Sequence, residues 1–230
     1  MQMRDIKELK DKHKGERCFI IGTGPSLLQT NFDLIKDEIL FGVNALFKGL
    51  KEFNIKPQYY AYTDNRKWNE WHKDILSLDT DLFLSGGALL TYLHNYEVCK
   101  KIQKREPYLI RMLGFMYHPM TPFFSTDLEE GTYNGDTVII DIPLQACYYM
   151  GFEEVYLLGC DCDYSGKPHF YDEPNEPITS LAGQGDWSRV FSCYEICKDA
   201  YEVAGRKIIN CTPNSKLPVF EKKNLEEVLL

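Results

Sequence analysis

The sequence predicts an α/β fold in which a mostly parallel sheet carries helices on both faces. Its 230 residues are 44% hydrophobic and 26% charged, which are ordinary values for a globular chain that buries a sizeable core. Short, nearly continuous apolar runs recur along the chain, as expected of strands buried on both faces of a parallel sheet. Helical stretches separate most of these runs, as βαβ units require. We therefore expect residues 1–230 to form one domain.

The apolar runs are the predicted strands. Each ends in a small or polar residue, and most are followed by a helical stretch. They cover residues 18–22, 40–44, 59–63, 81–85, 108–112, 155–159 and 207–211.

Two helices are predicted most clearly. In residues 187–204 the apolar side chains follow the i, i+3, i+4, i+7 spacing, and Gly205 provides a C-cap. Residues 138–150 are apolar nearly all round, which is typical of a buried helix. Pro143 lies inside this second segment and would cost about 3 kcal/mol in a helix interior. The helix therefore either begins near Ile142 or is kinked at the proline.

Two long segments are predicted to be lid-like loops. Residues 116–136 and 165–186 are both rich in proline and glycine, yet both also carry aromatic side chains. Loops of this length in a compact domain commonly close over a binding site.

Composition excludes several classes of function. The net charge is −8, whereas a general nucleic-acid binder presents a basic surface. The first residues are charged and contain no apolar stretch of signal-peptide length, and several of the eight cysteines lie in apolar runs. We expect reduced thiols in a cytoplasmic protein. No apolar run approaches the ~18 residues of a membrane span, although peripheral contact with a membrane stays open.

Polar residues follow the predicted strands at the point where each strand ends. In an open α/β sheet, ligands bind beyond the carboxyl ends of the strands, so these residues predict a site along one edge. They are Gly22, Thr23, Gly24, Pro25, Ser26, Asn44, Asp64, Asn65, Asp161, Asp163, Tyr164, Thr212, Pro213, Asn214 and Ser215.

The segment 22–26, GTGPS, favours a phosphate or nucleotide site. Glycines allow close approach of a ligand to the backbone, and Pro25 and Ser26 would begin a helix whose N–H groups suit an anion. Leu27 excludes the GxGxxG dinucleotide fingerprint, and no Gly-Lys-Ser/Thr follows to make a P-loop. A plain strand-to-helix turn is the alternative.

Two further features indicate chemistry. Asp161 and Asp163 alternate after a strand, where two carboxylates that point the same way could hold a divalent metal. Alternatively, Asp161 caps a loop and Asp163 is solvated. His169, in the following loop, is a candidate general base. Its alternative role is to pack on Phe170.

Three blocks of sequence carry a resemblance to known families. IIGTGPSL at 20–27, DTVIIDIPLQACYYMGFEEVYLLGCDCDY at 136–164 and NCTPNSKLPVF at 210–220 resemble the bacterial sialyltransferases of glycosyltransferase family 42. They resemble at least as closely the related 6-hydroxymethylpterin diphosphokinase MptE-like family. The resemblance implies a Rossmann-like domain with a lid over a cytidine-nucleotide site.

The resemblance also implies roles for individual residues. Asp161 matches an acidic residue of the family motif, and Tyr164 lies near a tyrosine that binds the leaving phosphate, so with His169 they form the expected catalytic set. The expected nucleotide-binding residues are Gly22, Thr23, Gly24, Pro25, Ser26, Asn44, Asp64, Asn65, Gly135, Thr137, Gly159, Thr212, Pro213 and Ser215.

This sequence departs from the sialyltransferases at two places. Asp186, Trp187 and Ser188 stand where those enzymes carry a base histidine, and no arginine precedes the helix at 138–150. We expect a glycosyltransferase of surface polysaccharide biosynthesis, which moves a nonulosonic sugar from a CMP-activated donor to a glycan or glycoconjugate. In that case His169 or Asp186 is the base, Tyr164 or Tyr171 binds the phosphate, and no cofactor is needed.

Two alternatives remain. One is a Mg²⁺-dependent pterin pyrophosphokinase, with Asp64, Asp161 and Asp163 as metal ligands. The other is a non-catalytic accessory protein that binds a nucleotide sugar. The resemblance also allows a homo-oligomer.

Overall fold

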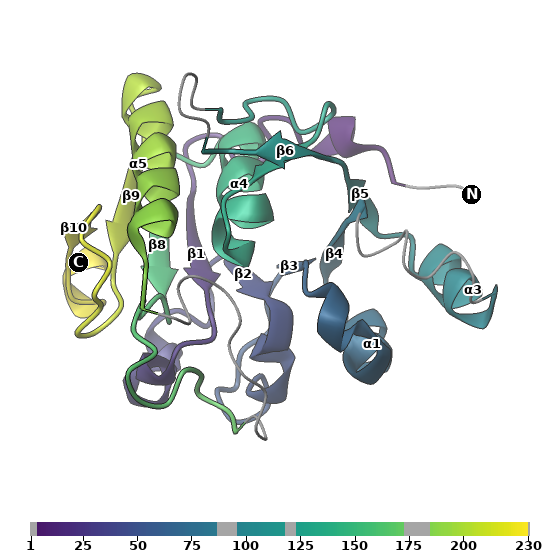
Figure 1. Cartoon of the computed structure of the whole chain (residues 1–230), viewed down its shortest axis with the longest axis horizontal. Coiled ribbons are helices and arrows are strands. Elements are labelled where there is room, and N and C mark those ends of the chain that lie inside the picture. The colour runs from purple at the N-terminus through teal and green to yellow at the C-terminus, as the bar shows by residue number, and fades with distance from the viewer. Residues whose placement is uncertain (1–3, 87–95, 118–122, 173–184, 230) are drawn as a thin grey trace.

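The chain folds around one large parallel sheet (Figure 1). The structure is a computed structural model that describes residues 4–86, 96–117, 123–172 and 185–229. The strand order is β10-β9-β8-β1-β2-β3-β4-β5, and every neighbouring pair is parallel. The strands are β1 (Arg17–Ile21), β2 (Leu40–Val43), β3 (Tyr59–Tyr62), β4 (Asp81–Ser85), β5 (Tyr108–Ile110), β8 (Glu154–Leu158), β9 (Lys207–Asn210) and β10 (Glu221–Lys222). The mostly parallel α/β fold and all the predicted strands are thus confirmed, whereas β10 was missed.

Each central strand is buried on both faces. In β1, Cys18 and Ile20 belong to one hydrophobic cluster, and Phe19 and Ile21 belong to another. Because successive side chains of a strand point to opposite faces, these two clusters are the cores on either side of the sheet.

Helices cover both clusters. On the first face lie α4 (Gln145–Met150) and α5 (Ser188–Val203), and on the second lie α1 (Trp68–Ser77) and α3 (Tyr96–Arg105). Their arrangement on both sides of the sheet confirms the predicted layers. After β1 and β2, however, the chain makes only short 3₁₀ helices. These are η2 (Pro25–Gln29) and η3 (Phe32–Leu34) after β1, and η4 (Asn44–Lys48) after β2.

The predicted long helices are both present. α5 buries Val190, Tyr194, Cys197 and Tyr201 against the sheet, and Gly205 follows it with a φ of +71°. A left-handed glycine at this place is a common helix C-cap.

The helix at 138–150 begins before Pro143 and accommodates the proline by a local change of winding. Residues Ile140–Leu144 form a π-helical turn that leads into α4. The side chain of Gln145 donates to the carbonyl oxygens of Ile140 at 2.7 Å and Tyr133 at 2.8 Å. A proline has no N–H to donate to the preceding turn, and the wider π-helical winding accommodates this missing donor.

The prediction of a continuous loop over 116–136 was wrong in part. β6 (Met112–Phe115) pairs with β7 (Thr132–Asn134) in a small parallel sheet, so 132–134 is a strand and the run 108–112 is divided after Ile110. Gly131 makes the pairing possible, because its φ is +128° and a Cβ there would lie 2.3 Å from the Arg111 carbonyl oxygen. Residues 118–122 and 173–184 of the predicted lids lie outside the described residues.

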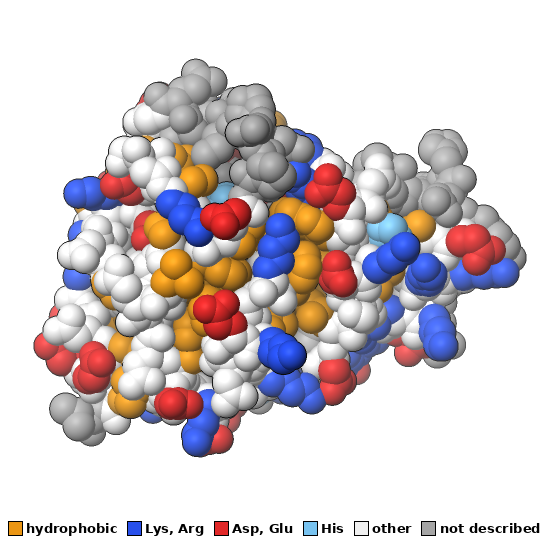
Figure 2. Space-filling model, turned by 90° about the horizontal axis from the view of Figure 1, so that it is seen from below, with side chains coloured by type: hydrophobic (Ala, Val, Ile, Leu, Met, Phe, Trp, Pro, Cys, Tyr) orange, Lys and Arg blue, Asp and Glu red, His pale blue; other side chains and the backbone are white. Residues whose placement is uncertain are grey.

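The described helices include none with the length and apolar character that crossing a membrane requires. No disulfide joins the cysteines, all of which lie within the described residues. Figure 2 views the molecule from the carboxyl ends of the central strands, and acidic and basic side chains are interspersed there around hydrophobic ones.

Candidate functional site

A crevice opens where the strand order of the sheet reverses. From β1 the chain proceeds through β2 to β5 on one side, and the later strands β8 to β10 lie on the other side. Ligands of open α/β sheets bind at this switch point, outside the carboxyl ends of the strands. A cavity of about 100 Å³ lies at this point, and its lining comes from the turns after β1 and β8, the start of the helix at 138–150 and the segment before α5. The lining residues are Gly22, Thr23, Gly24, Val43, Thr137, Val138, Ile139, Gly159, Cys160, Asp161, Cys162, Tyr164, Pro168, His169, Trp187 and Tyr194.

Three glycines bring the turns after β1 and β8 into direct contact. The N–H of Gly24 donates to the carbonyl oxygen of Gly159 at 2.9 Å. A Cβ on Gly22 would lie 2.5 Å from that same oxygen, and a Cβ on Gly24 would lie 1.8 Å from a carboxylate oxygen of Asp161. Gly159 itself has a φ of +65°. The glycines therefore allow the two backbones to touch at the base of the crevice.

Both carboxylate oxygens of Asp161 bind Ser26, at the start of η2, so this helix end is already occupied. Its Oδ1 accepts the Ser26 N–H at 3.1 Å, and its Oδ2 accepts the Ser26 hydroxyl at 2.7 Å. Burial raises the pKa of Asp161, and the two bonds from Ser26 oppose this shift. The expected start of a helix at Pro25 is confirmed, but the Ser26 N–H is occupied by this carboxylate.

His169 lies over the crevice in an aromatic setting. Its Nδ1 is 3.2 Å from the Thr23 hydroxyl oxygen, and its ring stacks on Tyr171 at 5.0 Å between centroids with an interplanar angle of 1°. The ring of Tyr164 lies 6.0 Å from His169 and 4.9 Å from Trp187. The three candidate catalytic residues, Asp161, Tyr164 and His169, thus all line one cavity.

Phe170 anchors the loop that carries His169. Its N–H donates to the Thr23 carbonyl oxygen at 3.0 Å, and its buried ring packs on Phe53 at 5.1 Å. His169 itself stacks on the next residue, Tyr171, whose ring in turn contacts Phe170.

The start of the helix at 138–150 forms another wall. Thr137, Val138 and Ile139 line the cavity. Behind them, the buried carboxylate of Asp141 accepts the N–H of Gly135 at 2.8 Å. Burial raises the pKa of Asp141 to about 7. Of the two residues predicted here, Thr137 lines the cavity, whereas Gly135 lies outside the lining in the turn before it. Asp141 was not predicted, because it carries no motif.

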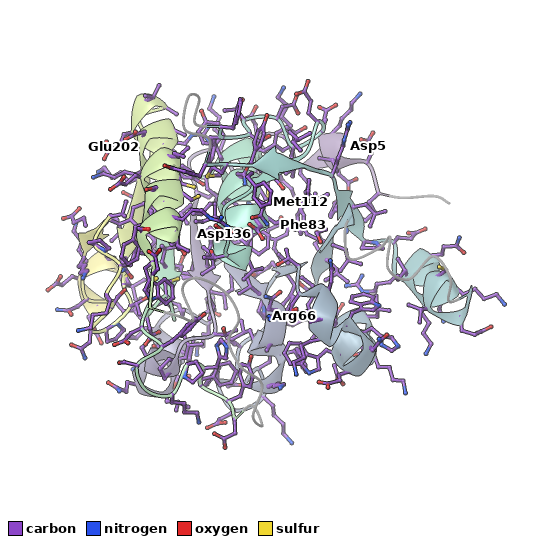
Figure 3. The ribbon with its side chains drawn as sticks, viewed as in Figure 1. Asp5, Arg66, Phe83, Met112, Asp136 and Glu202 are labelled. Carbon is purple, nitrogen blue, oxygen red and sulfur yellow. The ribbon has the colours of Figure 1, made fainter. Side chains whose placement is uncertain are left out.

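The predicted residues after β2 and β3 are at the same edge but outside the cavity lining. Asn44 has a φ of +41°, and its Oδ1 accepts the Thr63 N–H at 3.1 Å, which ties the ends of β2 and β3 together. Asp64 caps the next turn through the Arg66 N–H at 3.1 Å and pairs with its guanidinium. Asn65 begins that turn, and Figure 3 shows the labelled Arg66 near the carboxyl ends of β2 and β3.

The turn after β9 forms hydrogen bonds with the backbone of Cys160, one of the residues that line the crevice. The buried Thr212 hydroxyl oxygen accepts the Cys160 N–H at 3.0 Å, and the buried Ser215 hydroxyl donates to the Cys160 carbonyl oxygen at 2.7 Å. Both predicted nucleotide contacts thus bind the protein's own backbone. Thr212 and Pro213 also line a separate cavity of about 380 Å³.

The carboxylates of Asp161 and Asp163 do not converge, as they would if this segment were an extended strand. Cys162 has a φ of +52°, so the segment after β8 is no longer extended. Asp163 is turned away and accepts the Ser165 N–H at 2.9 Å. Within the described ranges, no three His, Cys, Asp or Glu side chains gather as a metal-binding group. The strand geometry expected for 161–163 was therefore wrong, and Asp64, Asp161 and Asp163 have separate partners.

Asp186 and Trp187 occupy different positions relative to the crevice. Asp186 is exposed and caps α5 by accepting the N–H of Ser188 at 3.0 Å, with the hydroxyl at 2.6 Å. Trp187, which sequence reasoning did not assign to the site, lines the cavity instead.

Together these features define a Rossmann-like α/β domain with a ligand crevice at its switch point. The family model described as 6-hydroxymethylpterin diphosphokinase MptE-like matches residues 1–167, and the chain belongs to this family. No curated protein sequence matches the chain.

Solved structures show the same fold. The sialyltransferase CstII from Campylobacter jejuni, in complex with the substrate analogue cytidine-5′-monophosphate, is 14% identical with a TM-score of 0.54. The match covers 91% of this chain and 85% of that one. A tyrosine-to-phenylalanine variant of sialyltransferase Cst-II in complex with CMP is 15% identical with a TM-score of 0.53, covering 90% of this chain and 85% of that one.

Proposed function

We propose that this chain is a glycosyltransferase that transfers a nonulosonic, sialic-acid-like sugar from a CMP-activated donor to a surface glycan or glycoconjugate. The observation that carries the proposal is the switch-point crevice, whose lining brings Asp161, Tyr164 and His169 together. The proposal is supported by the likeness in fold to sialyltransferases whose structures were solved with CMP. This likeness extends over most of both chains.

His169 is the proposed base. The acceptor hydroxyl attacks the anomeric carbon of the donor, the bond from that carbon to the phosphate oxygen breaks, and CMP departs. The imidazole takes the acceptor's proton. When Nδ1–H donates to the Thr23 hydroxyl oxygen, Nε2 carries the lone pair that a base requires. Asp186 fits this role less well, because its carboxylate is exposed and caps α5.

The departing phosphate needs hydrogen-bond donors. The Tyr164 hydroxyl is the proposed donor from the side chains, with Tyr171 as the alternative. The Ser26 N–H is occupied by Asp161, so backbone donors would come from Thr137 and Val138 at the start of the other helix. The cavity of about 100 Å³ is smaller than the ~300 Å³ of ordinary ligand pockets, so side chains of its wall must move on binding. No cofactor is required in this mechanism.

Membership of the MptE-like family favours a second candidate, a Mg²⁺-dependent pterin pyrophosphokinase. Asp64, Asp161 and Asp163 would be its metal ligands, and each would have to leave the partner it has now. A non-catalytic accessory protein that binds a nucleotide sugar is the third candidate, because an intact crevice does not require turnover.

A thermal-shift panel tests these candidates. CMP, CDP, ATP and GTP are each added with and without Mg²⁺ to the wild-type chain and to Gly24→Ala, which obstructs the crevice. Stabilisation by CMP without metal in the wild type alone supports the glycosyltransferase. Stabilisation only by ATP with Mg²⁺ contradicts it and supports the pyrophosphokinase. CMP binding without transfer of any CMP-activated sugar indicates the accessory protein, and no response to any nucleotide rejects all three.

A further inference from the structure

Among the described residues, Asp141 is the most deeply buried carboxylate that the proposed chemistry leaves unused. Its side chain lies on the π-helical turn behind the crevice wall, and the residue is 6% exposed. An acidic side chain is rarely buried without a charged partner, because removing its charge from water is costly. Here its hydrogen-bond partners are a backbone N–H and a side-chain amide, with no cation among the described residues.

Asp141 fixes the turn that leads into the crevice wall. Oδ1 accepts the Gly135 N–H at 2.8 Å, and Oδ2 faces the Asn134 amide nitrogen at 3.4 Å. The Asn134 amide is oriented for this contact, because its own Oδ1 accepts the Asp136 N–H at 3.1 Å. Directly after this turn come Thr137 and Val138, which line the cavity.

The surroundings of Asp141 disfavour its charge. Asp136 on the turn adds a negative charge, and Figure 3 shows it between α4 and α5. Arg189 on α5 pairs with both oxygens of Asp136, so that this cation serves Asp136 and not Asp141. From α5, the thiols of Cys193 and Cys197 also interact electrostatically with Asp141. From β7, the neutral amide of Asn134 faces the carboxylate, and from α4 the neutral amide of Gln145 lies 3.4 Å from the main-chain carbonyl oxygen of Asp141.

We propose that Asp141 is a positioning residue for the crevice, whose charged carboxylate holds the 134–137 turn and whose protonation releases the Asn134 contact and weakens ligand binding. The uncharged acid would turn an O–H or a weaker acceptor toward the Asn134 amide, while the Gly135 bond remains possible. Because the pKa of Asp141 is raised to about 7, this change falls near neutral pH. The ligand in this inference is CMP, and that part rests on the proposed function.

Two variants separate positioning from simple packing. Asp141→Asn keeps an acceptor for the Gly135 N–H but sets its NH₂ group against that of Asn134. A double variant that combines Asn134→Asp with Asp141→Asn exchanges the two side chains and restores a donor–acceptor pair. In it, the carboxylate now at position 134 would accept both from the Asp136 N–H and from the new amide at position 141. The exchange also moves the carboxylate to a half-buried position. There it is expected to be ionised already at neutral pH, so that it does not titrate near pH 7.

The first measurement needs no ligand. The amide signals of Gly135 and Thr137 are followed by NMR between pH 5 and 9 in the wild-type chain and in both variants. We expect both signals to titrate with a midpoint near 7 in the wild type, and no such titration in either variant. A Gly135 amide that does not titrate in the wild type overturns the inference, whether or not CMP binds.

The second measurement is CMP affinity by calorimetry at pH 6 and pH 8. CMP's own ionisation affects all proteins equally, so the comparison is between variants. We expect the wild type to gain about fivefold more affinity from pH 6 to 8 than Asp141→Asn does. The exchange variant should recover the affinity at pH 8 without that excess. Equal pH dependence in the wild type and Asp141→Asn overturns the inference. Absence of CMP binding at both pH values contradicts the proposed function instead, and the NMR titration then decides the inference.

Discussion

Both carboxylate oxygens of Asp161 accept hydrogen bonds from Ser26, one from its backbone N–H at 3.1 Å and one from its hydroxyl at 2.7 Å. These bonds join the end of β8 to the start of η2 across the switch point of the sheet. A carboxylate at a helix N-terminus occupies the place that a phosphate takes in many nucleotide sites. The turn after β1 therefore shapes the crevice, while the anion of a ligand must find its donors elsewhere.

Removing the hydrogen bonds between Asp161 and Ser26 should destabilise the folded chain. Asp161→Asn and Ser26→Ala are each expected to lower the free energy of unfolding by about 1–3 kcal/mol, the usual loss for hydrogen bonds to a charged group. The double variant should lose less than the sum, because both changes remove the same interaction. Urea unfolding at pH 7.5 measures all three. Asp163→Asn is the matched control and should change stability by less than about 0.5 kcal/mol, because an amide oxygen at this half-buried position can still accept the Ser165 N–H. Strict additivity would show that the two residues do not interact.

The close contact at Gly24 should tolerate no side chain. In Gly24→Ala the new Cβ would lie 1.8 Å from Asp161 Oδ2 and 2.8 Å from the Gly159 carbonyl oxygen. We expect a loss of about 1–3 kcal/mol from overpacking, together with loss of nucleotide binding. Gly166→Ala is the control, since nothing lies within 4 Å of a Cβ at that position. Thermal unfolding and calorimetric titration check both variants, and a Gly24→Ala protein of wild-type stability would contradict the geometry.

The large sheet was predictable because its signal is local. Runs such as 18–22 and 155–159 are short and apolar throughout, which is typical of strands buried on both faces of a parallel sheet. β10 lacked this signal, because its two residues, Glu221 and Lys222, are exposed. β7 also escaped prediction, because its pairing with β6 depends on the left-handed Gly131, a property of the backbone that the sequence does not specify.

Side-chain direction limited what could be predicted of the site. The sequence placed Gly22 and Gly24 at one edge of the sheet and His169 in the loop after Asp163, and all three line the cavity. It also showed that Thr212 follows β9, but not that its hydroxyl turns inward to the Cys160 backbone. Long-range hydrogen bonds of this kind depend on two segments about fifty residues apart, and no local pattern encodes them.

His169 should be needed for turnover more than for binding. His169→Ala is expected to reduce kcat by about 10²–10⁴-fold, the usual contribution of a general base, with CMP affinity nearly unchanged. Thr23→Val should cause a smaller loss, about tenfold, because it removes the hydrogen bond to Nδ1 but leaves the imidazole in place. Transfer from CMP-activated sugars measures kcat, and calorimetry measures CMP affinity. His72→Ala, on α1 away from the cavity lining, serves as the control. Full activity in His169→Ala would place the base on another residue.

The buried carboxylate of Asp141 should make stability fall as pH rises toward neutrality. Its pKa is raised by burial to about 7 in the folded chain, against about 3.9 for an unfolded aspartate. Between these values the folded state holds a proton that the unfolded state has released, so stability decreases with rising pH and levels off above pH 7. The full difference of about three pKa units corresponds to a loss of up to about 4 kcal/mol.

Asp141→Asn removes this ionisation and keeps nearly the same volume. Urea unfolding at pH 5 and pH 8 should therefore show a larger loss of stability in the wild type than in Asp141→Asn, and the excess is the contribution of this one carboxylate. Asp163→Asn is again the control, because hydrogen bonds from Ser165 lower the pKa of Asp163 and move its titration below this interval. If the wild type and Asp141→Asn lose equal stability between the two pH values, Asp141 is already charged at pH 5. The neutral amide of Asn134 and the Gly135 N–H would then suffice to hold its charge inside the core.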